Sequence, residues 1–352
     1  MPGSRSGADV HHASWRRWLK PTLIVLTLVV VGSIVAFTIS PAPGASTIRR
    51  VFAINDRQIT AALRKHTPDD VTSFIDEIYR DDDPDARLDV FVPDAAAADG
   101  QQLPTVVWTH GGAWVAGSKE EWRPYFMVLA SRGYTVVAIG YSLGPDQTYP
   151  TALHQVNDAL AYIQDNAERL HIDPEQIVIA GDSAGAQITS QYAAIVTNPD
   201  YAAAIGIEPT LAPEQLRGVL LYCGIYDFET FFGSSGLIGW GVRTSIWAYT
   251  GNRGTTFDAN PALAEMSSID HVTGDFPPAF ISGGNADPLT DSQSKPLAER
   301  LKDLGVAVDT LFFPEDHDPG QPHEYQFNLD SDEGQQALDQ SVEFLERVFG
   351  DS

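Results

Sequence analysis

Short apolar runs alternate with amphipathic stretches along most of this 352-residue chain. Runs rich in Val, Ile and Leu predict strands at 105–110, 134–142, 177–183, 218–227, 278–284 and 307–314, and two earlier runs, 71–79 and 86–93, predict a further pair. Helical patterns lie at 120–131, 151–170, 184–197, 292–304 and 333–349. This alternation predicts an α/β fold with a mostly parallel central sheet and helices on both faces.

One strand end carries an unusual turn. In the stretch IVIAGDSAGAQIT, residues 177–189, Ser183 stands between a buried strand and a helix, with Gly181 and Gly185 beside it. Small residues permit a tight turn, and the first N–H groups of the following helix point toward the serine. Gly-x-Ser-x-Gly in this setting is typical of a nucleophilic serine. Because ligands of such sheets bind beyond the carboxyl ends of the strands, we expect the active site here.

A serine nucleophile needs a base and an acid that orients the base. Asp287 follows the apolar run 278–284 and is expected at the same sheet edge as Ser183. Asp291 is the alternative acid, although its place at the start of the next helix suits a helix cap. We therefore predict that Asp287 is the orienting acid.

Two histidines, His317 and His323, follow the last predicted strand, and their spacing does not separate them. His317 lies among acidic residues, which is typical of a surface cation. His323 precedes Tyr325 and Phe327, aromatic anchors that can fix the ring over the site. We choose His323 as the base and keep His317 as the alternative. A metal site made from these histidines and acids lacks a clear ligand spacing, so no metal is expected.

The segment HGGAW, residues 110–114, follows another predicted strand. Glycines leave backbone N–H groups unobstructed, so Gly111 and Gly112, together with Ala184, are predicted to form an oxyanion hole. His110 is expected to brace this loop.

The segment from about 228 to 260 interrupts the alternation with aromatic residues and glycines, and we interpret it as an inserted cap. Its aromatic side chains either line an apolar pocket or anchor the insertion to the body. We expect a substrate pocket lined by Trp114, Tyr141, Trp240 and Trp247.

The amino terminus predicts a membrane segment. Arg16, Arg17 and Lys20 precede the uncharged apolar run 22–40, whose helix is about 28 Å long. The basic flank predicts a cytoplasmic tail at 1–21, a transmembrane signal-anchor helix at 22–40, a spacer at 41–70 and an extracytoplasmic catalytic domain at 71–352. A cleaved signal peptide, giving a secreted protein, is the alternative.

The formal net charge of −25 argues against nucleic acid as a partner, because phosphates repel an acidic surface. Residues 1–40 hold four basic residues and one acidic residue, so the rest of the chain carries −28. The single cysteine, Cys223, excludes an internal disulfide and is expected to be buried.

Four segments occur in the order that a known family uses: HGGAW, YSLGPDQTYP at 141–150, AGDSAG, and GNADPLTD. From about Val71 onward, the chain resembles the α/β-hydrolase superfamily and, within it, the hormone-sensitive-lipase-like serine esterases. The resemblance implies hydrolysis of short or medium acyl esters without a cofactor. It also implies roles for Ser183, Asp287 and His323 as triad and for Gly111, Gly112 and Ala184 as oxyanion donors.

The chain departs from that family pattern at four places. Ala113 and Ala186 stand where the family has glycine, Ser142 stands where arginine is common, and HEYQF has a longer spacing from His323 to phenylalanine.

An amidase or peptidase with the same triad is an alternative function. A catalytically inactive binding protein on the same fold is another.

Overall fold

The computed structural model describes residues 12–233 and 235–350. Within these residues, the strands form one sheet in the order β1-β2-β4-β3-β5-β6-β7-β8. The pairs β1/β2 and β2/β4 are antiparallel, and the others are parallel. The predicted mostly parallel sheet is thus confirmed. The strands are β1 (Val71–Ile78), β2 (Arg87–Pro93), β3 (Leu103–Thr109), β4 (Thr135–Ile139), β5 (Ile172–Asp182), β6 (Leu216–Tyr222), β7 (Ala279–Gly283) and β8 (Val308–Phe312).

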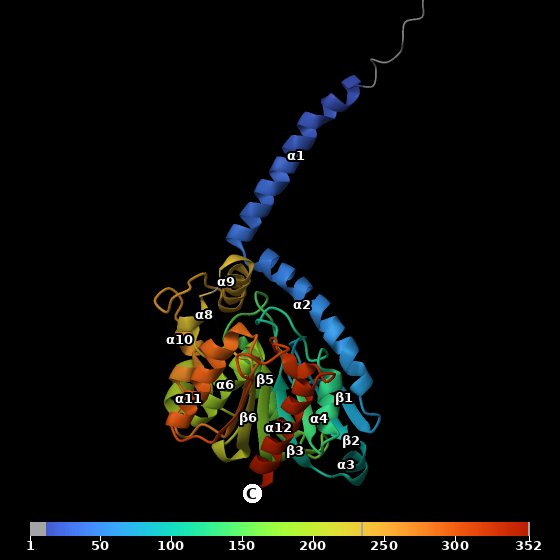
Figure 1. Cartoon of the computed structure of the whole chain (residues 1–352), viewed down its shortest axis with the longest axis vertical. Coiled ribbons are helices and arrows are strands. Elements are labelled where there is room, and N and C mark those ends of the chain that lie inside the picture. Colours follow the sequence, from blue (N-terminus) through green and yellow to red (C-terminus); the bar gives the residue numbers. More distant parts are fainter. Residues whose placement is uncertain (1–11, 234, 351–352) are drawn as a thin grey trace, which may run out of the picture.

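Helices cover both faces of the sheet (Figure 1). Successive side chains of β5 point to opposite faces, so Ile177 and Ile179 join one hydrophobic core while Val178 and Ala180 join another. The first core contains side chains of α5, α6 and α11, and the second those of α4 and α12. The body helices are α3 (Asp94–Asp99), α4 (Arg123–Ala130), α5 (Thr151–Asp165), α6 (Ala184–Thr197), α7 (Pro199–Ile205), α10 (Ala262–Met266), α11 (Lys295–Asp303) and α12 (Asp332–Gly350).

Some boundaries differ from the sequence expectation. The predicted helix 151–170 ends at Asp165, because the side-chain amide of Asn166 donates to the carbonyl of Tyr162, 2.9 Å away, and the chain then turns. The predicted helix 292–304 begins with a wider π-type segment, Thr290–Ser294, before α11. Helix α6 has the predicted bounds.

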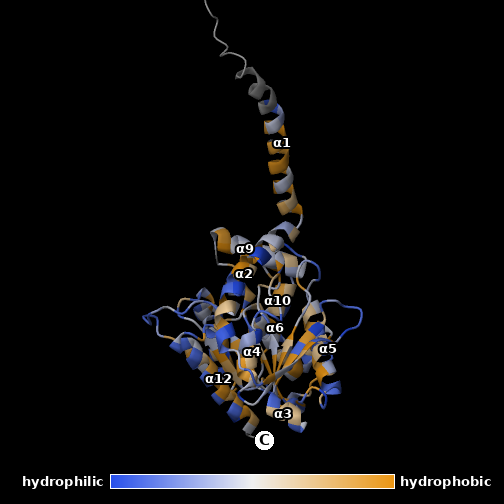
Figure 2. Ribbon diagram, turned by 90° about the vertical axis from the view of Figure 1, so that its right-hand side faces the viewer, coloured by the Kyte–Doolittle hydropathy of each residue, from blue (hydrophilic) through white to orange (hydrophobic). Residues whose placement is uncertain are grey.

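At the amino terminus, α1 (His12–Ile39) projects away from the body as a long apolar helix (Figure 2). Its part from Lys20 to Ile39 has a mean hydropathy of 2.6 and is not buried, so it is long and apolar enough to cross a membrane. A signal sequence near an amino terminus has the same properties. Residues 1–11 of the predicted cytoplasmic tail lie outside the described residues.

The segment expected as a spacer is mostly a helix, α2 (Ala42–Leu63), that packs on the body and on the cap. The cap consists of α8 (Phe228–Phe231) and α9 (Gly236–Thr250). A Cβ atom at Gly44 of α2 would lie 2.5 Å from Cγ2 of Thr244 in α9, so the two helices cross closely. Arg49 of α2 also donates to the carbonyls of Val115, at 2.6 Å, and Gly144, at 2.8 Å.

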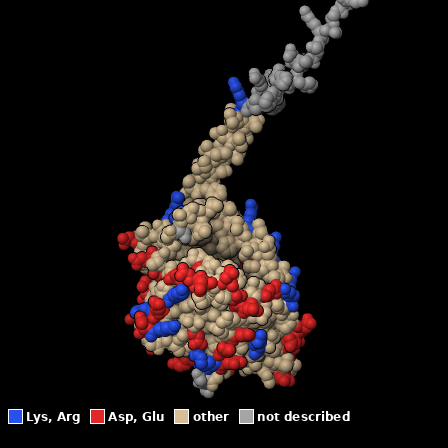
Figure 3. Space-filling model, in the orientation of Figure 1, with Lys and Arg blue, Asp and Glu red and all other residues tan. Residues whose placement is uncertain are grey.

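Acidic side chains are spread over the visible face of the body (Figure 3), in keeping with its strong negative charge.

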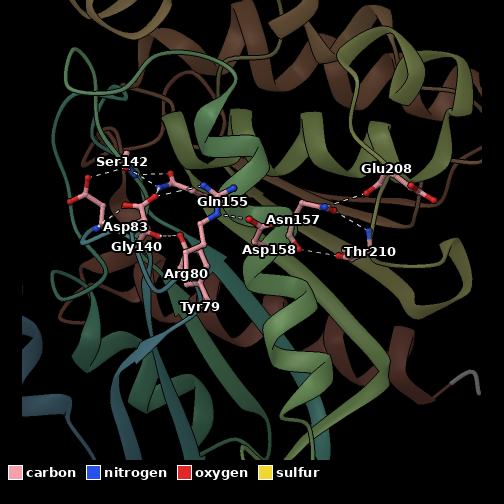
Figure 4. A network of polar contacts seen from close by, with 11 residues as sticks. Tyr79, Arg80, Asp83, Gly140, Ser142, Gln155, Asn157, Asp158, Glu208 and Thr210 are labelled. Carbon is pink, nitrogen blue, oxygen red and sulfur yellow. Dashed lines mark hydrogen bonds and ion pairs between the residues drawn. The ribbon is translucent and has the colours of Figure 1, made fainter.

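A network of polar contacts holds the loop 140–150 (Figure 4). It includes acidic side chains and Ser142, which stands where the family pattern has an arginine. Gln155 accepts from the N–H of Ser142 at 2.8 Å and donates to Asp83 at 2.7 Å, while the Ser142 hydroxyl donates to Asp85 at 2.9 Å. Arg80 completes this network through Asp83 and Asp158.

Candidate active site

Ser183 lies on a sharp turn between β5 and α6. Its backbone has φ 52° and ψ −119°, a conformation that a serine adopts only under strain. The turn is held by its N–H, which donates to the carbonyl of Tyr222 in β6 at 2.8 Å. At Gly185, a Cβ atom would lie 2.0 Å from the carbonyl oxygen of Thr109, so no larger residue fits there. The predicted strand–turn–helix is therefore present, with Ser183 displayed at its apex.

The structure brings Ser183, His323 and Asp287 together from three separate segments. The Nε2 atom of His323 lies 2.9 Å from Oγ of Ser183. The Nδ1 atom of the same ring lies 2.7 Å from Oδ2 of Asp287. Asp287 is itself fixed, because its Oδ1 accepts from the N–H of Leu289 at 2.9 Å. These contacts form one continuous hydrogen-bonded chain from carboxylate to hydroxyl.

The loop that carries His323 is attached to the loop that carries Asp287. The N–H of Gln321 donates to the side-chain oxygen of Asn285 at 2.8 Å, and the carbonyl of Gln321 accepts from the N–H of Ala286 at 2.9 Å. Behind His323, both aromatic anchors are buried. The Tyr325 hydroxyl lies 2.6 Å from that of Ser282, and Phe327 stacks on Trp122 with ring centres 4.1 Å apart.

The alternative residues lie in other contacts. His317 pairs with Glu333, with Nε2 and Oε1 2.8 Å apart, and its ring packs on Phe313. Asp291 is exposed and pairs with Lys295 at 2.5 Å. Neither side chain is hydrogen-bonded to Ser183 or His323.

The N–H groups of the three predicted oxyanion donors have different partners, and that of Gly111 is already hydrogen-bonded. The Gly111 N–H donates to Oδ2 of Asp182 at 2.9 Å, so it does not face the reacting centre. Among the described residues, the N–H groups of Gly112, Ala113 and Ala184 donate to no protein atom. Gly112 and Ala184 are buried, and buried N–H groups need an acceptor. Ala113, with φ 53°, thus replaces Gly111 in the set of available donors.

The four predicted pocket residues separate into two pairs. Trp114 and Tyr141 are buried, and each holds a neighbouring segment by a hydrogen bond. Trp114 donates to Gln187 at 3.0 Å, and the Tyr141 hydroxyl donates to the carbonyl of His110 at 2.9 Å. Tyr141 also stacks on the His110 ring, which supports the predicted bracing role of His110. Burial lowers the pKa of His110 to about 4, which keeps it neutral.

The other pair belongs to the cap. Trp240 packs against a small apolar cluster that contains Val115 of the loop 110–117, and Ala113 of the same loop packs against that cluster too. Trp247 lies under the guanidinium of Arg253, 4.5 Å from its ring centre.

Cys223 was expected to be buried, and it is, but sequence reasoning missed its neighbours. Its sulfur, a carboxylate oxygen of Asp287 and a ring nitrogen of His323 lie within 4.8 Å of one another. The order of β6 beside β7 places it there, because Cys223 directly follows β6. Burial raises the pKa of Cys223 to about 11, so the thiol is neutral. Burial opposes protonation of His323, whereas the Asp287 carboxylate, hydrogen-bonded to the ring, favours it and raises the pKa of His323 well above its usual value.

A second feature that sequence reasoning missed is a set of acidic side chains around Gly111. Asp182 is buried and Glu324 half-buried beside it, and Glu121, also half-buried, interacts with Asp182. Desolvation raises the pKa values of Asp182, Glu324 and Glu121, the last two to about 8. Glu324 follows His323 in a left-handed conformation, φ 59°, and its Oε1 lies 3.9 Å from Nε2 of His323. Asp182 holds its position by accepting from Nε1 of Trp108 at 2.7 Å. This set of acidic residues therefore contacts both His323, through Glu324, and Gly111, through Asp182.

A polar cavity of about 400 Å³ lies beside the braced loop and is lined in part by His110, Tyr141 and Lys119. None of Ser183, Asp287 and His323 lines it. Lys119 is already paired with Asp76 and Asp89, each at 2.7 Å.

Comparison with known proteins identifies a family and related chains. Residues 88–301 match the BD-FAE family. Esterase LipQ of Mycobacterium tuberculosis is 28% identical over 214 residues, which are 60% of this chain and 48% of LipQ. Ethyl acetate hydrolase of Pseudomonas putida is 28% identical over 217 residues, which are 59% of this chain and 63% of that enzyme. The chain spans between 45% and 64% of the length of these and three other curated relatives.

Solved structures show the same fold. Esterase B from Lactobacillus rhamnosis superposes with a TM-score of 0.73 at 21% identity, covering 87% of this chain and 96% of that one. A hyperthermophilic esterase from Pyrobaculum calidifontis superposes with a TM-score of 0.66 at 24% identity, covering 86% and 93%. With the family match extending over more than half of its length, this chain belongs to the BD-FAE family and has the α/β-hydrolase fold.

Proposed function

We propose that this protein hydrolyses carboxylic esters through an acyl-enzyme on Ser183. The observation that carries the proposal is the hydrogen-bonded chain in which His323 lies 2.9 Å from Ser183 and 2.7 Å from Asp287. The names of the relatives, an esterase and an ethyl acetate hydrolase, support the ester as substrate.

In the acylation half-reaction, Nε2 of His323 accepts the proton of the Ser183 hydroxyl while Oγ attacks the ester carbonyl carbon. Asp287 orients the ring and stabilises the imidazolium. The carbonyl π electrons move to oxygen, and the N–H groups of Gly112, Ala113 and Ala184 stabilise the resulting oxyanion. When the tetrahedral intermediate collapses, His323 gives its proton to the departing alkoxide, which leaves as the alcohol.

Deacylation repeats these steps with water. His323 takes a proton from water as its oxygen attacks the acyl carbon, and collapse breaks the bond to Oγ of Ser183. The proton returns to Oγ, and the carboxylic acid leaves. Every proton is carried by residues of this chain, and the mechanism uses neither cofactor nor metal.

The acyl group proposed is short or medium in length, following the resemblance to hormone-sensitive-lipase-like esterases. Helix α2 and the cap support a limited acyl site, because Ala45 and Ile48 of α2 and Ala248 of α9 form one apolar cluster with Val115 of the loop 110–117. We also propose that α1 stays in place as a membrane anchor with the catalytic domain outside the cytoplasm. The contact of its end with the cap, Arg253 to the carbonyl of Thr38 at 2.7 Å, supports a retained helix.

Labelling with a fluorophosphonate tests the nucleophile. The probe is expected to attach to Ser183 in the full-length protein, and Ser183→Ala is the matched control. Absence of labelling on a folded protein would favour the alternative of an inactive binding protein.

A panel of p-nitrophenyl esters of graded acyl length, run beside the corresponding anilides, tests ester against amide. We expect turnover of the acetate to octanoate esters. Faster turnover of the anilides would identify an amidase instead.

A further inference from the structure

The membrane helix and the cap meet at one end of the body. Only residues 40 and 41 separate α1 from α2, and α2 then crosses α9 at Gly44 and Thr244. Arg253, just after α9, donates to the carbonyl of Thr38 at the end of α1, 2.7 Å away. Figure 1 shows α9 at the base of α1. If α1 spans a bilayer, these contacts hold the cap at the bilayer surface.

The cap exposes large apolar side chains at this end. Leu237 and Ile238, in the first turn of α9, are 86% and 69% exposed. In Figure 2, apolar ribbon of α9 lies level with the junction of α1 and α2. Adjacent exposed side chains of this size mark an interaction site rather than ordinary surface.

The two segments at this end are basic, whereas the whole chain carries −25. Residues 40–50 and 236–253 contain four arginines and no acidic residue. Arg49 is paired with Asp146 at 2.9 Å, while Arg50 and Arg243 are exposed. Figure 3 shows a mostly uncharged surface around the base of α1, above the acidic body.

The same elements cover the reacting centre. Ala45 and Ile48 of α2 and Ala248 of α9 form an apolar cluster with Val115, and Ala113 packs against it. Ala113 is also one of the free oxyanion donors described above. Helices α2 and α9 therefore contact the loop 110–117 of the proposed acyl-transfer site on one side and form the surface at the end of α1 on the other.

We propose that Leu237, Ile238, Arg50 and Arg243, here called the neck face, seat on an anionic lipid bilayer, and that the substrate is an ester dissolved in that bilayer. The apolar pair enters the acyl-chain boundary while the arginines contact lipid phosphates, the arrangement of an interfacial amphipathic helix. The inference rests on the proposed ester hydrolysis and on retention of α1. It adds where the substrate comes from and how the cap is oriented.

The first test compares two substrates with the full-length protein in vesicles of phosphatidylcholine and phosphatidylglycerol. One is dioctanoylglycerol dissolved in the bilayer, and the other is water-soluble p-nitrophenyl acetate. The double variant Leu237→Asp/Ile238→Asp is expected to lose about tenfold on the bilayer ester, because charged residues leave the interface, and less than about twofold on the soluble ester. Equal rates of variant and wild type on the bilayer ester would overturn the inference.

A matched control is available on the far edge of the sheet. Ile75 and Ile78 of β1 are each 43% exposed and lie outside the cap. Ile75→Asp/Ile78→Asp is expected to change both rates by less than about twofold. A loss on the bilayer ester as large as that of the neck-face variant would mean that any surface charge has this effect, and would also overturn the inference.

A second test needs no activity, so it separates failure of this inference from failure of the proposed function. Leu237→Cys is labelled with the environment-sensitive dye NBD, while the native Cys223 is buried. We expect a blue shift in vesicles and quenching by lipids that carry a nitroxide near the headgroup, and neither effect with Ile75→Cys. Quenching with no ester turnover by the wild type would refute the proposed function alone. A blue shift that lipid nitroxides do not quench would indicate a second copy of this chain on the neck face.

Discussion

The sheet edge that carries the proposed triad and the cap above it hold their side chains in different ways. At the sheet edge, Ser183, Asp287 and His323 follow buried strands or lie in loops fixed by several hydrogen bonds. The cap contacts the site through helix crossings, such as Gly44 against Thr244, and a small apolar cluster. The difference suggests that the sheet edge sets the chemistry, while the cap sets access and orientation. Changes at the sheet edge should therefore affect kcat, and changes in the cap should affect KM.

The largest effect is expected at the nucleophile. Ser183→Ala should lower kcat about 10⁴-fold or more, because acyl transfer loses its attacking atom. The unfolding midpoint should stay within a few degrees of wild type, as Ser183 is on a strained turn and its hydroxyl has one partner. Steady-state kinetics and thermal unfolding measure the two quantities. Activity near the wild-type level would rule out Ser183 as the nucleophile.

The two histidines of one loop should differ strongly. His323→Ala is expected to cost about 10³-fold or more in kcat, whereas His317→Ala should cost less than about threefold, because His317 pairs with Glu333 away from the serine. The two variants serve as controls for each other. If His317→Ala were the more damaging, the base would have to be reassigned.

The pH dependence of activity tests the protonation state of His323 at the sheet edge. His323 acts as a base only when neutral, and the Asp287 carboxylate raises its pKa above the usual 6.5. Activity should therefore rise with pH through a limb above pH 6.5 and fall about tenfold per unit below it. Cys223→Ala should leave this limb in place, since the thiol that it removes is neutral. A limb displaced to lower pH in this variant would show that Cys223 also favours the imidazolium.

The buried carboxyls predict a dependence of stability on pH. Burial raises the pKa of Glu324 from 4.5 to about 8, so the folded protein binds more protons than the unfolded chain between these values. The free energy of unfolding should fall as pH rises from about 4.5 to 8, and Glu324→Gln should remove part of that fall, about 1 kcal/mol or more. Chemical denaturation at several pH values measures it. Parallel profiles for variant and wild type would contradict the assignment.

The smallest effect on activity is expected where α2 contacts the cap. Gly44→Val pushes α2 away from α9, because its Cβ would meet Thr244 at 2.5 Å. We expect KM to rise about threefold with kcat within about twofold, and the free energy of unfolding to fall by about 1–3 kcal/mol. Ser46→Val, at an exposed position of the same helix, is the control. A loss confined to kcat would show that the cap also positions the chemistry.

Local patterns in the sequence were enough to predict the fold and to select most residues of the candidate site. Alternation of apolar runs predicted the sheet, and the turn at Gly181–Gly185 placed Ser183 between strand and helix, because hydrophobic periodicity and turn chemistry are properties of neighbouring residues. The aromatic residues after His323 favoured it over His317, and Tyr325 and Phe327 are indeed buried behind its ring.

Tertiary structure decided what depends on residues distant in sequence. Gly111 and Ala113 differ as oxyanion donors only because Asp182, 71 positions away, accepts the N–H of Gly111. The neighbours of Cys223 follow from the pairing of β6 with β7, and the place of Glu324 from a left-handed turn after His323. The packing of α2 over the site depends on Gly44 and Thr244, two residues 200 positions apart. By itself, the sequence determined the helices, the strands and the candidate site residues, because these depend on the local order of residues. Strand order and helix packing alone decided which polar groups face each other, since burial and hydrogen bonding act between segments that the chain brings together only when folded.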